Sequence, residues 1–138
     1  ETFALMNNNY LVKRWNNKNS QANIYLLSSV GLNTENSESM ATVGIHGDWE
    51  NRQFMVMEML EYYSYNNAWV SNTRVAYSPF KVDYSKTSTW FIAHYRVEYH
   101  NDSYSYMFFP VIRLFKKNYL FELGSNGKNS FLSFMTHF

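Results

Sequence analysis

Residues 89–123 constrain the fold of this 138-residue chain more than any other segment. Residues 90–100 and 103–115 each show the alternation of apolar and polar side chains that is typical of a β-strand. Asn101 and Asp102 stand between them, and both residue types tolerate the positive φ of a tight hairpin turn. The segment therefore predicts a long antiparallel hairpin, followed by a third strand at residues 119–123.

Folding the chain about this turn predicts which side chains share a face of the hairpin. One face is almost wholly apolar or aromatic, with Tyr99, Val97, Tyr95, Ala93 and Phe91 opposite Tyr104, Tyr106, Phe108, Pro110 and Ile112. The other face is more polar, with His100, Glu98, Arg96 and His94 against Ser103, Ser105, Met107 and Phe109. A slip of one residue would mix the two faces, so the register is well specified.

The rest of the chain predicts an α+β fold in a single domain, residues 1–138. Strands are expected at residues 23–28, 41–46, 69–77 and 80–84. Asp48 is a good helix N-cap, and the apolar residues after it recur at a helical period up to about Tyr65. Ser130 is expected to cap a short C-terminal helix. The predicted architecture is a twisted antiparallel sheet whose aromatic face is covered by a long central helix and the short C-terminal helix.

Charge and composition narrow the classes of function. The chain has 12 basic and 11 acidic residues without runs of either sign, which argues against a nucleic-acid partner. No apolar stretch has the length of a membrane-spanning helix, so no transmembrane segment is predicted. The chain has no cysteine, which excludes disulfides, thiolate metal sites and a Cys nucleophile. Because the first residue is Glu1 and not Met, we expect a removed leader and an exported or periplasmic protein, with the cytoplasm as the alternative.

His46 and Asp48 form the first candidate binding site. A histidine and a carboxylate two residues apart can bind a metal ion or exchange protons. Helix capping by Asp48 explains the same pattern without a ligand.

The second candidate is the row of His94, Arg96, Glu98 and His100 on the polar face of the hairpin. Such a row can bind an anion or a metal ion, but a solvated sheet face predicts the same alternation. The sequence offers no convincing third zinc ligand, no strained serine nucleophile and no catalytic pair of carboxylates. We therefore predict no catalytic residue, metal or cofactor, and lean away from an enzyme.

The order of elements resembles the PsbP-like superfamily, which also contains DcrB-like bacterial lipoproteins and effector-associated chaperones. The resemblance covers most of the chain. It includes Trp15 followed by strands at 23–27 and 42–45, the central helix, a strand at 70–75, the hairpin, an aromatic strand at 118–123 and a closing helix with Ser133 and Phe134. It implies an α/β/α sandwich without shared catalytic residues.

The resemblance implies a non-enzymatic binding or adaptor protein that engages a protein or peptide partner through its aromatic sheet or rim. The alternative is a small-molecule binder or enzyme that resembles the nuclear transport factor 2-like superfamily, with a cone-shaped fold around an apolar pocket. His94 or His46 would then be polar groups of that pocket.

Overall fold

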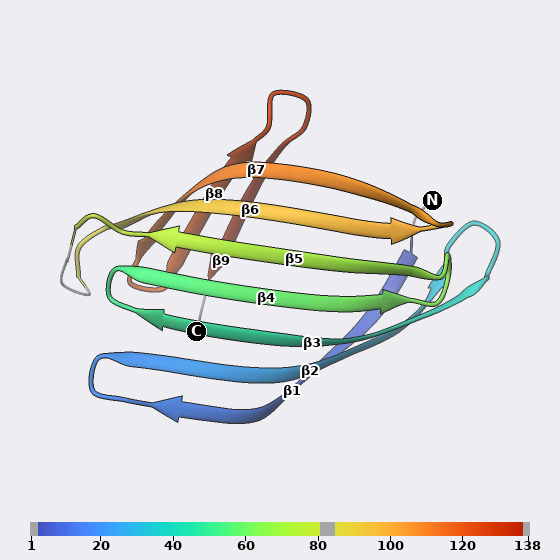
Figure 1. The fold of residues 1–138 in the computed structure, drawn as a ribbon, viewed down its shortest axis with the longest axis horizontal. Helices are drawn as coiled ribbons and strands as arrows, with labels where there is room; N and C mark the ends of the chain where they lie inside the picture. Colours follow the sequence, from blue (N-terminus) through green and yellow to red (C-terminus); the bar gives the residue numbers. More distant parts are fainter. Residues whose placement is uncertain (1–2, 81–84, 137–138) are drawn as a thin grey trace.

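The computed structural model describes residues 3–80 and 85–136, and all its regular elements are β-strands. Nine strands form one sheet in which each strand pairs antiparallel with the next along the chain (Figure 1). Their bounds are β1 (Phe3–Asn16), β2 (Ser20–Asn33), β3 (Ser39–Asn51), β4 (Phe54–Tyr63), β5 (Ala68–Tyr77), β6 (Ser88–His100), β7 (Ser103–Lys116), β8 (Tyr119–Ser125) and β9 (Ser130–Thr136).

The predicted hairpin is confirmed as β6 and β7, in the predicted register. Tyr99 pairs with Tyr104, and the ten residues of the predicted apolar face are cross-strand partners as expected. Asn101 and Asp102 have φ values of 49° and 59°, which are the left-handed conformations that the turn requires. The third predicted strand is β8, after a turn in which Lys117 also has a positive φ.

The predicted α+β fold class is wrong, because the described residues contain no helix. Asp48 is a residue of β3, where it pairs with Asn23 and Met57, and does not cap a helix. The segment expected to be the central helix forms the end of β3 and the whole of β4, and the expected C-terminal helix is β9. The strand expected at residues 80–84 lies mostly outside the described residues.

The prediction of a helix over the residues of β4 is wrong for a physical reason. From Phe54 to Tyr63 both faces of the strand carry apolar side chains, with Met55, Met57 and Met59 on one face and Phe54, Val56 and Leu60 among those on the other. When both faces are apolar, a helical stripe can be traced through the same residues. A helix over this segment would put Val56, Met59 and Leu60 on one stripe, whereas in the strand Met59 lies on the opposite face from Val56 and Leu60.

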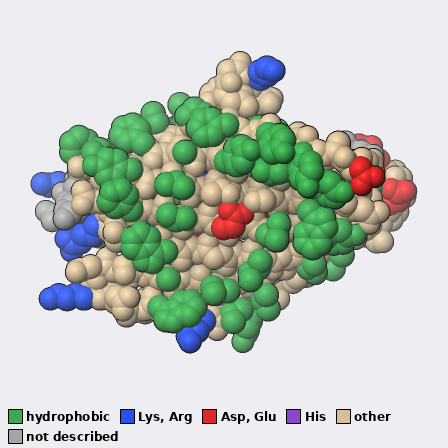
Figure 2. Space-filling view, in the orientation of Figure 1, with side chains coloured by type: hydrophobic (Ala, Val, Ile, Leu, Met, Phe, Trp, Pro, Cys, Tyr) green, Lys and Arg blue, Asp and Glu red, His purple; other side chains and the backbone are tan. Residues whose placement is uncertain are grey.

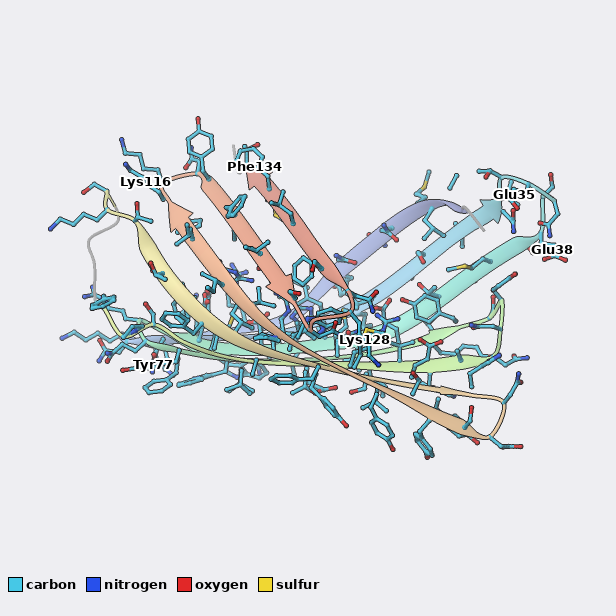
Figure 3. The ribbon with its side chains drawn as sticks, turned by 90° about the horizontal axis from the view of Figure 1, so that it is seen from above. Glu35, Glu38, Tyr77, Lys116, Lys128 and Phe134 are labelled. Atoms are coloured by element: carbon cyan, nitrogen blue, oxygen red, sulfur yellow. The ribbon has the colours of Figure 1, made fainter. Side chains whose placement is uncertain are left out.

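The sheet is curled into a trough (Figure 3). β1–β3 rise on one side and β8–β9 on the other, while aromatic side chains, including the labelled Tyr77, project from the convex underside. A small apolar cluster lies on the concave face, where Ala76, Ile92 and Val111 are buried against Met55, Trp90, Phe109 and Phe131. No other described element covers the convex face.

Gly44 marks a close approach between β3 and β4. A Cβ atom at this position would lie 2.6 Å from the backbone oxygen of Leu60. This oxygen belongs to the backbone of the paired strand β4, which cannot easily move away. We expect Gly44→Ala to lower the free energy of unfolding by about 1–3 kcal/mol, as overpacking does elsewhere. Gly47, on the same strand, is the matched control, because its added Cβ would meet only the Asn23 oxygen, at 4.0 Å. Urea unfolding of both variants under the same conditions checks this, and equal effects would contradict it.

Candidate functional site

The two faces of the sheet differ sharply in polarity, and the convex face is the apolar one. Register places most of the exposed large hydrophobic side chains on this face, where Figure 2 shows them spread across the sheet. Among the charged side chains of the described strands, only Lys13, Glu58 and Lys116 lie on it. Lys13 and Lys116 are near strand ends, so among these residues Glu58 is the one charged side chain near the middle of its strand on the convex face.

Aromatic side chains form a row near each end of the convex face. At one end, Tyr62, Trp69, Tyr99 and Tyr104 are successive cross-strand partners. The rings of Tyr62 and Trp69 lie 5.1 Å apart, and those of Tyr99 and Tyr104 lie 4.9 Å apart. At the other end the row is Phe54, Tyr77 and Phe91. The two rows are eight residues apart on β4, or about 25 Å at the rise of a β-strand.

Glu58 does not stand alone on this face. Its two carboxylate oxygens accept hydrogen bonds from the hydroxyls of Ser71 and Thr73, the first at 2.5 Å. The neighbouring strand β5 thus supplies two donors that satisfy part of the hydrogen-bonding capacity of the carboxylate. These three residues form a small polar island on a face whose exposed large side chains are mostly apolar.

The concave face carries two charged networks, and the predicted pair of His46 and Asp48 belongs to the first. Arg14 Nε donates to Asn23 Oδ1 at 2.7 Å, and Asn23 Nδ2 donates to Asp48 Oδ1, also at 2.7 Å. His46 Nε2 lies 3.1 Å from Asp48 Oδ2. Asn23, which is 6% exposed, therefore joins a guanidinium to a carboxylate across β1, β2 and β3.

The second network is centred on Glu122 of β8. Arg113 Nε donates to Glu122 Oε1 at 2.7 Å, and Arg74 Nη1 reaches the same oxygen at 3.2 Å. Arg74 Nε also donates to His94 Nδ1 at 3.2 Å, so a neutral His94 ring carries its proton on Nε2, 3.0 Å from Asn72 Oδ1. The curl of the sheet brings these groups together from strands that lie as far apart as β5 and β8.

The predicted row on β6 does not act as one group. His94 joins the Glu122 network, whereas Arg96 and Glu98 pair with each other at 3.6 Å and are about one-third exposed. His100 lies at the hairpin tip, where its Nε2 is 2.9 Å from Asn101 Nδ2. Within residues 3–80 and 85–136, no three His, Asp or Glu side chains come close enough to hold a metal ion.

Sequence reasoning missed Arg14, Asn23, Arg74, Arg113 and Glu122. Asn23, Arg74, Arg113 and Glu122 occupy concave positions in the alternation of their strands, which is the signal that would have found them. Arg14 follows a β-bulge between Leu11 and Lys13 that reverses the alternation of β1, so that signal is lost for it. A cavity of about 340 Å³ lies between the two networks, with Met55 and Met57 among its lining residues. The concave face thus combines a solvent-accessible hollow with opposite charges.

No family model, no curated protein and no solved structure matches this chain. The resemblance to the PsbP-like superfamily therefore stays a prediction, and the α/β/α sandwich that it implies is not the observed fold. Among the described residues, no helix has the length and apolar character needed to cross a membrane.

Proposed function

We propose that this sheet is part of the wall of a membrane-embedded protein, with its convex face against lipid acyl chains and its concave face lining an aqueous path. The observation that carries the proposal is the inverted polarity of the trough: apolar outside and charged inside. A curved sheet in water buries its apolar side chains in its concave interior and exposes polar ones. The opposite arrangement is the one that suits strands between lipid and an aqueous lumen.

The dimensions of the convex face support this assignment. Strands that cross a bilayer at a tilt need about 9–11 residues, and β1 to β7 have 10–14. The aromatic rows, about 25 Å apart, have the spacing of the two membrane interfaces, where aromatic side chains gather, and Tyr95 and Tyr106 lie between the rows. The earlier prediction of no transmembrane segment used the length of apolar runs, which is a criterion for helices.

The unpaired strand edges of the sheet must be satisfied if the sheet lies in a bilayer. The outer edges of β1 and β9, and residues 103–110 on the β8 side of β7, pair with no strand among the described residues. Backbone N–H and C=O groups cannot stay unpaired in hydrocarbon, where each costs several kcal/mol. All of these edges must therefore pair with further strands when the sheet lies in a bilayer.

A protein partner is the second candidate for the convex or rim surface, and one observation favours it. β8 pairs with β7 only at Val111–Lys116, although β6 pairs with β7 along its whole length. Within the described parts of the chain, residues 103–110 of β7 therefore have an unpaired edge on which an extended peptide can add a strand. This keeps the predicted adaptor role as an alternative.

Labelling with single cysteines tests the membrane assignment, and the chain is suited to it because it has no cysteine of its own. Leu60 and Met59 are adjacent on β4 and lie on the convex and concave faces respectively. We expect a fluorophore on Leu60→Cys to be quenched by nitroxides on lipid acyl chains and protected from aqueous iodide. The same fluorophore on Met59→Cys should respond to iodide instead. Equal iodide quenching at both positions in liposomes would contradict the proposal.

A further inference from the structure

The cavity on the concave face has an apolar floor between two walls of opposite charge. The floor is formed by Met55 and Met57 of β4. Asp48 and Met57 are cross-strand partners, and so are Met57 and Arg74. The carboxylate on β3 and the guanidinium on β5 thus belong to strands about 10 Å apart, with one thioether between them.

The acidic wall consists of Asp48 and Glu50, and the guanidinium of Arg14 also lines the cavity on this side, where it is hydrogen-bonded to Asn23. Glu50 lines the cavity and makes no hydrogen bond or ion pair with any residue that the structure describes. Partial burial and the neighbouring Asp48 carboxylate raise the pKa of Glu50, and the Arg113 guanidinium across the cavity offsets part of this rise. Asp48 keeps its Oδ1 engaged by Asn23, with Oδ2 near His46. A cationic group entering the cavity would therefore find the unpaired carboxylate of Glu50 beside that of Asp48.

The basic wall consists of Arg74 and Arg113. Both guanidinium groups share a single carboxylate, Glu122, so one formal positive charge of this group is not neutralised by it. The Arg113 guanidinium also extends over the floor, since its Nη1 lies 4.0 Å from Met55 Sδ. An anionic group in the cavity would meet donors that Glu122 alone does not saturate.

We propose that this cavity binds a small zwitterion, such as a free α-amino acid, with its ammonium toward Asp48 and Glu50 and its carboxylate toward Arg74 and Arg113. A volume of about 340 Å³ is at the lower end for ligand pockets and suits a solute of that size. The thioether floor favours an apolar side chain, because methionine adapts its shape to such groups. This binding site rests on the proposed function, because it requires the concave face to be open to water.

Calorimetric titration of the folded full chain with three related probes tests the site. L-leucine carries both charges, isocaproate lacks the ammonium and isoamylamine lacks the carboxylate. We expect L-leucine to bind roughly 10- to 100-fold more tightly than either single-charge probe, since each lost charge removes hydrogen bonds to an ionised group. Equal affinity for L-leucine and one of the single-charge probes, or no binding of L-leucine, would overturn the proposal.

Two variants assign the effect to the acidic wall. Glu50→Gln removes a carboxylate without a partner among the described residues, so the fold should tolerate it. It should weaken L-leucine roughly 10-fold and leave isocaproate unchanged. Glu61→Gln is the matched control, because Glu61 lies on the concave face of β4 but lines a different cavity, and it should change neither. If Glu50→Gln leaves L-leucine binding unchanged, the assignment of Glu50 is wrong.

The outcomes separate this inference from the membrane assignment. Failure of L-leucine to bind, with acyl-chain quenching at Leu60→Cys intact, overturns only the zwitterion site. Binding of L-leucine with no acyl-chain quenching overturns only the membrane assignment.

Discussion

The Phe108→Arg variant is expected to lose about 2–4 kcal/mol of folding free energy in lipid, which is the cost of Arg near the midplane on the lipid-facing side of a strand. Phe108 is 53% exposed on the convex face and lies four residues from both Tyr104 and Ile112, midway across the apolar band. In a water-exposed sheet the same change at a half-exposed position would cost less than about 1 kcal/mol. Urea unfolding in liposomes, compared with wild type, measures the difference.

Met59→Arg is the control for Phe108→Arg. Met59 lies at a similar depth but on the concave face, where its cross-strand partners are His46 and Asn72. A charge at this position stays in contact with water and polar groups, so we expect a loss of less than about 1 kcal/mol. Losses of equal size in the two variants would remove the energetic distinction between the faces on which the membrane assignment depends.

Glu122→Gln is expected to destabilise the fold by about 2–4 kcal/mol. The change keeps the volume of the side chain but leaves Arg74 and Arg113 without their shared carboxylate. Removing one partner of a buried ion pair is costly because the remaining charge stays desolvated. The expected destabilisation is smaller than the largest costs known for breaking buried ion pairs, because the Arg113 side chain is 22% exposed. Chemical unfolding of the variant beside wild type gives the number.

Glu98→Gln is the matched control for Glu122→Gln, because it removes the carboxylate of another Arg–Glu pair on the concave face. The Arg96–Glu98 pair is 3.6 Å long and about one-third exposed, so its loss should cost less than about 1 kcal/mol. A cost of that size for Glu122→Gln as well would mean that Glu122 does not organise the second network.

The β6–β7 hairpin could be predicted to the residue because its faces differ in polarity. His94, Arg96 and Glu98 alternate with apolar side chains, so only one register separates the two sets. Asn101 and Asp102 then set the position of the turn. In this segment the local pattern and the turn chemistry agree, and tertiary structure adds no further constraint.

The same reasoning failed at Asp48 and on β4 for two physical reasons. Asp48 satisfies the preference of a helix N-cap, yet its carboxylate is used by Asn23, which is 25 residues away in sequence. The three methionines of β4 make its concave face as apolar as its convex one, so alternation carries no signal there. Both positions depend on partners that only the assembled sheet brings close.

The charged networks could be predicted only in part. Register places Arg14 beside Asn23, but no local pattern indicates that Arg74 on β5 reaches Glu122 on β8. That contact arises from the curl of the whole sheet. The aromatic face was recognised from sequence, whereas its place on the outside of the curl was not, because it was expected to need helices as a cover.

The order of the strands also bears on how the chain folds. Every strand pair joins neighbours along the chain, so each of the eight pairings forms across a short connection. The entropy lost on closing such loops is small. The sheet can therefore grow one hairpin at a time, with each completed hairpin offering its open edge as the template for the next. Pairing of the outer edges of β1 and β9, which no neighbouring hairpin can supply, would then be the slow step of assembly.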